Sequence, residues 1–333
     1  MLFACSRAPC LRRAERVRVL RSSAQVGFSN KAYRPYDPRL KDFGRIIEDD
    51  FSVLREQYDA PKNPIILAHG VLGFDELHLA GPNLPGIRYW RGITDAFAAK
   101  GVEVMTAAVP PSGSIEARGA ALGHVIAKKA TGKSVNIIAH SMGYANSVDE
   151  QGLDSRYMIS RLKPKGVNVL SLTTISTPHR GSAFADFMID QLGPIHLARI
   201  YKALEFCGME TGAFSQLTRQ YMQEEFNPKT PDVEGVKYYS YGASLEPQRW
   251  SIFRPSHEII KRLEGAENDG LVSVPSSQWG TYRGTLVGVS HLDLINWTNR
   301  LKWMFWELTG TKKNFNAVAF YLNIADMLAK EGL

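Results

Sequence analysis

The chain has 333 residues, 44% of them hydrophobic, which is enough to build one large α/β domain. No stretch approaches the roughly 18 to 20 consecutive apolar residues of a transmembrane helix, so any membrane contact should be peripheral. Of the three cysteines, Cys5 and Cys10 lie near the N-terminus and leave Cys207 alone in the body, which excludes a disulfide framework or a cysteine metal cluster there.

Residues 1–30 contain six arginines and one acidic residue, Glu15. An arginine-rich, acid-poor segment without an apolar core region is typical of a mitochondrial transit peptide, although a disordered basic tail would have a similar composition. Six positive charges minus one negative charge account for +5 of the formal net charge of +7, so residues 31–333 carry only +2. We therefore expect a mitochondrial location and no nucleic-acid partner.

Residues 31–61 are predicted to form an approach segment with one short helix near residues 43–58. From residue 62 onward, strands and helices alternate in one domain that runs to residue 333, which predicts an α/β fold with a doubly wound, mostly parallel sheet and helices on both faces. The predicted strands cover residues 64–69, 102–109, 135–140, 167–175, 236–241 and 285–289. The predicted helices cover residues 88–100, 115–129, 142–148, 294–308 and 316–333, with several more between 184 and 227.

The segment Ala139-His-Ser-Met-Gly143 follows a β-branched run and precedes a helix-capable segment. It matches the pattern G-x-S-x-G with alanine at the first position, and small residues are needed at both ends because the turn crowds the positions flanking the serine. A strand, a sharp turn and a helix would place the hydroxyl at the positive end of the helix dipole. Ser141 is therefore the candidate nucleophile, and an ordinary serine in a strand-helix turn is the alternative.

The strand that begins at Pro64 ends in His69-Gly-Val71, with a second glycine at Gly73. A glycine at a strand end lets the backbone direct its N–H groups toward a reacting carbonyl group. The backbone N–H groups of Val71 and Met142 are the candidate oxyanion donors. The alternative is that the two glycines only form a turn at the end of the strand.

Two later segments supply the partners that a nucleophilic serine needs. Asp269 lies in an Asn-Asp-Gly turn, with Glu267 as the nearest competing carboxylate, and His291 follows the predicted strand 285–289. The order serine, aspartate, histidine predicts a Ser141, Asp269, His291 triad. Among the other histidines, His69 and His179 are expected to orient loops, whereas His140 should point to the opposite side of its strand from Ser141.

Residues 184–227 contain more helix than a single crossover between strands requires, and they are rich in apolar and aromatic side chains. Ordinary core packing would produce this composition. An inserted helical lid over the carboxyl edge of the sheet would produce it as well, and we expect such a lid at about residues 184–227.

Over roughly residues 62–300 the chain resembles the α/β-hydrolase triacylglycerol lipases of the bacterial true-lipase type, and with its leader it is similar to the mitochondrial triacylglycerol lipases of fungi. The most specific pieces are Ala139-His-Ser-Met-Gly143, Thr177-Pro-His-Arg-Gly-Ser182, Asn268-Asp-Gly270 and His291-Leu-Asp293. The resemblance implies Ser141 as nucleophile, His291 as general base and then acid, and Asp269 as its orienting partner.

The bacterial lipases of this type also hold a structural calcium ion through two aspartates and backbone carbonyls. Asp293 matches one aspartate, but Trp297 stands where the family has a glutamine, and the segment Ser240–Glu267 is short for the second aspartate. We therefore assign no cofactor and leave calcium open, with Asp293 as its candidate ligand. The secretion-linked disulfide of the family is absent, as expected for an intracellular protein.

The expected function is hydrolysis of long-chain acyl esters of glycerolipids by serine acylation and deacylation, on a lipid substrate at a membrane or droplet surface. A phospholipase or an acyltransferase would use the same triad. A catalytically inactive homologue that only binds lipid is the alternative from another class, and the complete set of triad and oxyanion residues argues against it.

Overall fold

The computed structural model describes residues 44–69, 76–77, 87–90, 92–109, 113–140, 151–191, 215–248, 251–296 and 315–333. All of these residues belong to one compact unit that spans Pro38–Leu333. Several predicted features lie outside the described residues. They are the leader, Val71, Gly73, Ser141, Met142, Trp297, the helix expected over residues 142–148, most of the helix expected over residues 294–308, and the middle of the predicted lid, residues 192–214.

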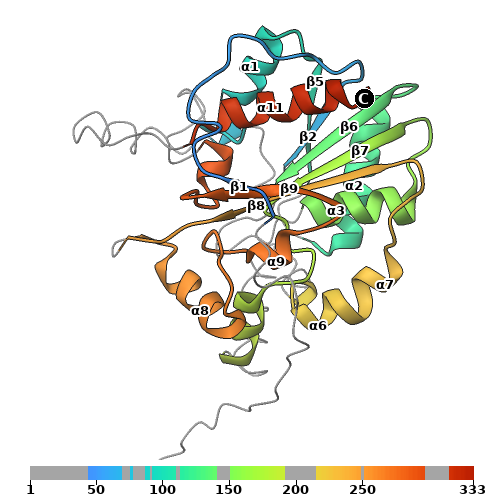
Figure 1. The fold of residues 1–333 in the computed structure, drawn as a ribbon. Coiled ribbons are helices and arrows are strands. Elements are labelled where there is room, and N and C mark those ends of the chain that lie inside the picture. Colours follow the sequence, from blue (N-terminus) through green and yellow to red (C-terminus); the bar gives the residue numbers. More distant parts are fainter. Residues whose placement is uncertain are drawn as a thin grey trace, which may run out of the picture. The chain divides into compact units, whose positions relative to one another are not determined.

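A seven-stranded sheet, in the order β1-β9-β8-β7-β6-β2-β5, organises the described part of the chain (Figure 1). All of its described strand pairings are parallel. The strands are β1 (Ile46–Ile47), β2 (Ile65–His69), β5 (Val104–Ala108), β6 (Ser134–His140), β7 (Asn168–Ile175), β8 (Lys237–Ser244) and β9 (Thr281–Val287). A separate antiparallel pair joins β3 (Glu76–Leu77) and β4 (Ile87–Arg88).

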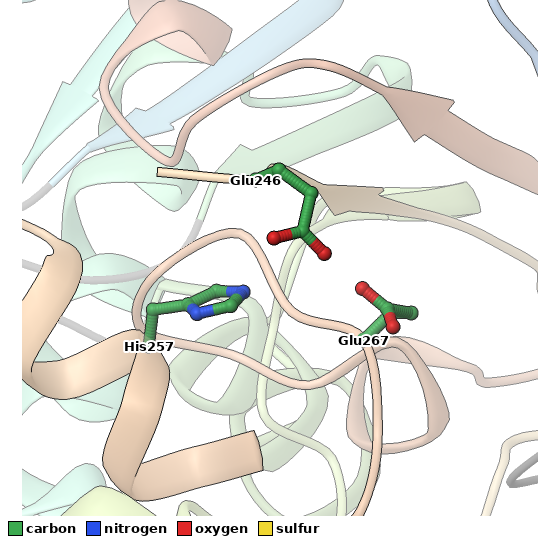
Figure 2. Close-up of side chains that lie close together, drawn as sticks. All are labelled: Glu246, His257 and Glu267. Carbon is green, nitrogen blue, oxygen red and sulfur yellow. The ribbon is translucent and has the colours of Figure 1, made fainter. Parts of the chain in front are cut away.

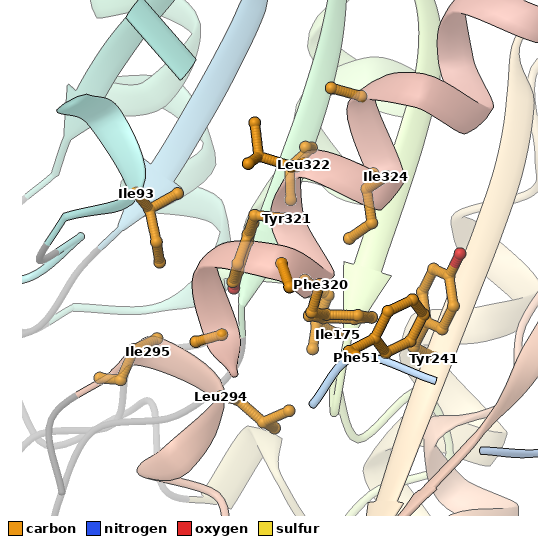
Figure 3. Packing of buried hydrophobic residues seen from close by; sticks show 14 of the residues in the cluster. Phe51, Ile93, Ile175, Tyr241, Leu294, Ile295, Phe320, Tyr321, Leu322 and Ile324 are labelled. Atoms are coloured by element: carbon orange, nitrogen blue, oxygen red, sulfur yellow. The ribbon is translucent and has the colours of Figure 1, made fainter. Parts of the chain in front are cut away.

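Helices cover both faces of the sheet, which confirms the predicted α/β fold. Alternate residues of β2 pack in different cores, as the two-residue period of a strand requires. Ile65 and Leu67 belong to a core with α1 (Ile93–Ala99) and α11 (Ala317–Lys330), where Phe320 packs among strand residues (Figure 3). Ile66 and Ala68 belong to a second core with α2 (Ile115–Lys129) and η3 (Met158–Leu162).

Local signals explain the predicted bounds of α2, which the structure confirms. The side chain of Ser114 accepts a hydrogen bond from the Ala117 N–H at 3.2 Å and so caps the N-terminus. Lys128 and Lys129 occupy the last turn, where their charges interact favourably with the helix dipole. No helix within the described ranges is long and apolar enough to cross a membrane.

Three expectations about the elements were wrong. Residues 44–58 contain no helix, because Ile46 and Ile47 instead pair with Thr285 and Leu286 at the edge of the sheet. The helix expected over residues 88–100 begins only at Ile93, after the short strand β4. The predicted elements also omitted α8 (Arg254–Glu264), which begins with proline in its first turn and ends at a left-handed glycine, Gly265.

The predicted lid segment is helical at both described ends. Residues 183–191 are helical, and α6 (Arg219–Tyr221), η4 (Met222–Phe226) and α7 (Asn227–Lys229) follow the undescribed part. Side chains from both ends pack together with α2 and α3 (Gln151–Tyr157). The buried cluster consists of Ile115, Leu153, Ala185, Leu217, Met222 and Phe226. Both ends are therefore anchored on the body of the domain, and the lid itself stays a prediction.

Candidate active site

The carboxyl ends of two neighbouring strands lead into the predicted nucleophile and oxyanion loop. β2 ends at His69 and β6 ends at His140, and the two strands pair with Ala68 opposite Ala139. In a parallel sheet the carboxyl ends of neighbouring strands lie at the same edge, where α/β proteins place their ligands. The chain therefore enters both predicted segments from the same edge of the sheet.

Asp269 and His291 form a buried pair at this site. Oδ2 of Asp269 lies 2.6 Å from Nδ1 of His291, and neither side chain is exposed to solvent. The backbone N–H of His291 also donates to the Asp269 carbonyl at 3.1 Å. An ionised carboxylate can only accept, so Nδ1 donates its proton to Asp269 and the lone pair of the ring lies on Nε2 of His291.

The turn that carries Asp269 holds the carboxylate in a fixed orientation. Oδ1 of Asp269 accepts the backbone N–H groups of Leu271 at 3.0 Å and Val272 at 2.8 Å. Gly270 adopts a φ of +102°, and a Cβ atom at this position would lie 2.6 Å from the Phe253 side chain, so only glycine fits. The Asn-Asp-Gly signal in the sequence therefore corresponds to a turn that positions one carboxylate oxygen for His291.

Glu267, the competing carboxylate, does not take this place. Its Oε1 lies 3.2 Å from Nζ of Lys261 on α8, away from the histidine. The structure therefore brings Asp269 rather than Glu267 to His291.

His140 lies against His291, a contact that the sequence analysis did not predict. The two rings have centroids 4.7 Å apart, and Nδ1 of His140 is hydrogen-bonded to the Tyr89 hydroxyl at 2.8 Å. Burial, and then the nearby charge of a protonated His291, hold the pKa of His140 well below its usual value of 6.5. A neutral His140 adds no second positive charge beside His291. The sequence offered one signal for this contact, since His140 directly precedes Ser141.

His179 orients the loop after β7, as expected. Its Nε2 is hydrogen-bonded to Oγ1 of Thr174 at 2.9 Å, and its ring stacks on Trp279 with centroids 5.3 Å apart. The guanidinium carbon of Arg156 lies 3.5 Å from the centroid of the same Trp279 ring. Burial, and then the charge of Arg156, lower the pKa of His179 well below 6.5, so this histidine is neutral inside the fold.

The same loop is tied to the segment that carries Asp269. Oγ of Ser276, in α9 (Val274–Ser277), donates to the Gly181 carbonyl at 2.6 Å. Oγ of Ser182 donates to the Leu271 carbonyl at 3.4 Å. The motif Thr177-Pro-His-Arg-Gly-Ser182 therefore packs directly against the Asp269 turn.

Asp293, the candidate calcium ligand, is engaged in its own loop. Its Oδ2 accepts the Ser290 N–H at 3.0 Å and the Ser290 hydroxyl at 2.6 Å. Within the described ranges, Asp293 belongs to no group of three or more histidine, cysteine or carboxylate side chains that could hold a metal ion.

Comparisons with known proteins relate the whole domain to lipases, although no family model matches the chain. Triacylglycerol lipase 2 of Saccharomyces cerevisiae is 38% identical, and the match covers 83% of this chain and 94% of the relative. A triacylglycerol lipase of Pseudomonas fragi is 26% identical, and the match covers 81% of this chain and 97% of the relative.

Solved structures show the same fold at lower identity. The crystal structure of Staphylococcus hyicus lipase matches with a TM-score of 0.57 and 19% identity, covering 82% of this chain and 98% of the lipase. A metagenomic carboxyl esterase matches with a TM-score of 0.60 and 17% identity, covering 84% of this chain and 79% of the esterase. The solved structures and the parallel sheet agree on the fold, and the likeness to the yeast enzyme shows that the chain belongs to the triacylglycerol lipase family of carboxylic ester hydrolases.

Proposed function

We propose that this lipase hydrolyses long-chain acyl esters of glycerolipids, triacylglycerols foremost, with Ser141, His291 and Asp269 as its catalytic residues. The observation that carries the proposal is the buried Asp269–His291 pair, because its histidine lies against His140, the residue that precedes Ser141 in the chain. The likeness to two proteins named triacylglycerol lipase supports the choice of substrate.

In the proposed reaction, Nε2 of His291 takes the proton of the Ser141 hydroxyl as Oγ attacks the ester carbonyl. The backbone N–H groups of Val71 and Met142 stabilise the negative charge on the carbonyl oxygen. His291 then gives its proton to the departing alcohol, which leaves an acyl group on Ser141. A water molecule, deprotonated by the same Nε2, releases the fatty acid and restores the serine.

The fixed Asp269 carboxylate explains how His291 can act as the base in this cycle. It accepts the Nδ1 proton throughout, so His291 keeps the tautomer whose Nε2 can act as a base. The negative charge of Asp269 also stabilises the imidazolium that forms while His291 holds the serine proton. Because both groups are buried, water does not compete for these hydrogen bonds.

Labelling with a fluorophosphonate probe, followed by peptide mass spectrometry, tests the nucleophile. We expect the probe on Ser141, and we expect triolein hydrolysis to fall to background in Ser141→Ala and in His291→Ala because triad members act as a unit. Labelling at another serine, or substantial hydrolysis by Ser141→Ala, would overturn the proposal. A substrate panel with a phospholipid and with an alcohol acceptor separates a triacylglycerol hydrolase from a phospholipase or an acyltransferase.

We further propose that the enzyme works in mitochondria at a lipid surface, with residues 184–227 as its lid. The arginine-rich composition of residues 1–30 supports import, and the apolar side chains of the segment 184–227 support contact with lipid.

A further inference from the structure

Three side chains that the proposed reaction does not use converge beside the Asp269 turn (Figure 2). Glu246 lies just after β8, His257 lies on α8, and Glu267 lies two residues before Asp269. One ligand atom from each side chain can be chosen so that all three lie within 4.8 Å of one another. Three residues that lie ten or eleven positions apart in the sequence are therefore gathered at one point.

His257 is the part of this cluster that needs an explanation. Its side chain belongs to a residue only 3% exposed, and its Nε2 has no hydrogen-bond partner among the described residues. A buried polar atom without a partner destabilises the fold unless something else binds it. Figure 2 shows the nitrogen-bearing side of the ring facing the space between Glu246 and Glu267.

Lys261 offers another explanation for why the carboxylates of Glu246 and Glu267 can lie close together. Its Nζ lies 3.0 Å from Oε1 of Glu246 and 3.2 Å from Oε1 of Glu267, so the lysine balances their charge. Lys261 contacts only the carboxylates in this cluster, however, and Nε2 of His257 has no hydrogen-bond partner among the described residues. The side chain of Lys261 is 44% exposed, so it can move into solvent when another cation binds.

We propose that Glu246, His257 and Glu267 bind a divalent transition-metal ion, with Zn²⁺ as the preferred metal. One imidazole nitrogen and two carboxylate oxygens suit zinc, whereas calcium and magnesium prefer oxygen ligands alone. Tetrahedral zinc with bonds of about 2.0 Å places its ligand atoms roughly 3.3 Å apart, so the cluster must contract by about 1.5 Å at its widest pair. The side chain of Glu246 is 77% exposed and can make this movement.

The position of the cluster gives the metal a structural role. Zinc would join the end of β8, helix α8 and the segment that enters the Asp269 turn. The backbone already links two of these parts, because the Leu245 N–H donates to the Asn268 carbonyl at 2.9 Å. A metal here would therefore stabilise the turn that orients His291, without contact with the reacting atoms.

Zinc titration of the chelator-treated full-length protein, followed by calorimetry and thermal unfolding, tests the site. We expect Glu246→Gln to weaken zinc binding at least about tenfold, because it removes a charged ligand while leaving an exposed side chain of similar size. Lys261→Met should bind zinc more tightly than the wild type, because the competing cation is gone. Glu258→Gln is the matched control, since Glu258 is exposed on α8 and pairs with Arg254 instead.

At a zinc concentration roughly 100-fold above Kd, the wild-type Tm should rise by about 5 °C, and the rise should vanish in Glu246→Gln. His257→Ala should lose the site as well, with circular dichroism to establish that it folds. Equal zinc affinity of the wild type and Glu246→Gln would overturn the site. So would a wild-type Tm that zinc does not change, or a Lys261→Met variant that binds no more tightly. These readouts do not depend on ester hydrolysis, so the proposed lipase reaction can fail or hold independently of the metal site.

Discussion

At the scale of single residues, the Asp269 carboxylate determines what His291 can do. Both of its oxygens are engaged, Oδ1 by two backbone N–H groups and Oδ2 by Nδ1 of His291. Oδ1 fixes the turn, and Oδ2 selects the tautomer of the histidine. The two tasks can therefore be separated by a substitution that changes only one of the oxygens.

Asp269→Asn makes this separation. The amide oxygen can still accept from Leu271 and Val272, so the turn should persist. The amide nitrogen would donate to Nδ1, which puts the proton of His291 on Nε2 and removes the base. We expect kcat on a soluble p-nitrophenyl ester to fall by on the order of 10³ to 10⁴. Glu234→Gln, at an exposed turn, is the matched control. A kcat within tenfold of the wild type would contradict the role of Asp269.

His179 makes stability depend on pH. Its pKa in the folded protein lies well below the ordinary 6.5, first because of burial and then because of Arg156. Below pH 6.5 the unfolded chain therefore binds a proton that the folded chain does not, and the free energy of unfolding falls as the pH falls. This histidine contributes up to about 1.4 kcal/mol per pH unit to that loss.

Urea unfolding between pH 5.0 and 6.5 measures this contribution. We expect His179→Gln to lower stability at pH 7 but to flatten the pH dependence. His124→Gln, on the exposed face of α2, should leave the slope of the wild type unchanged. Parallel pH profiles for His179→Gln and the wild type would show that His179 is not the group responsible.

At the scale of elements, the segment 184–227 is anchored at both ends. Ala185 near its start, and Met222 and Phe226 near its end, are buried against α2 and α3. A lid needs such fixed ends, with an apolar inner face between them that becomes exposed on opening and is stabilised by lipid. Phe184 and Phe187 lie on the first described helical stretch and are only partly buried, as such a face requires.

The triple substitution of Phe184, Phe187 and Leu192 by serine tests the lid. Each methylene of an acyl chain bound to an apolar lid is worth about 0.8 kcal/mol, so activity on triolein emulsions should fall while activity on a soluble short-chain ester stays near the wild-type level. Leu162→Ser, an exposed apolar residue on η3, controls for the loss of surface hydrophobicity. Equal losses on both substrates would identify the segment as core instead of lid.

At the scale of the whole molecule, positive charge is concentrated in residues 1–30, and the remaining chain carries only +2 of the formal +7. Arginines in an acid-poor segment respond to the inner-negative potential of mitochondria, so we predict import followed by cleavage of the leader. Sequencing the N-terminus of the protein from isolated mitochondria checks this. A variant with the six arginines replaced by glutamine should remain in the cytosol. A mature protein that still begins at Met1 would contradict the prediction.

The sequence by itself determined the features that depend on neighbouring residues. Strand β2 follows from a continuous apolar run and β7 from a run rich in apolar and β-branched residues, and α2 follows from its Ser114 cap and the lysines of its last turn. Gly270 marked the turn because no other residue fits there. These signals are local, so they were sufficient for the parallel α/β fold and for the order of the candidate triad.

Only the tertiary structure decided the features that depend on distant partners. Ile46 and Ile47 form a strand because β9 offers them an edge, although their own sequence favoured a helix. The tertiary structure also separates the two candidate carboxylates. Asp269 lies 2.6 Å from His291, whereas Glu267 lies 3.2 Å from Lys261 on α8. The cluster of Glu246, His257 and Glu267 has no local sequence signal at all, because it exists only where a strand, a helix and a turn meet.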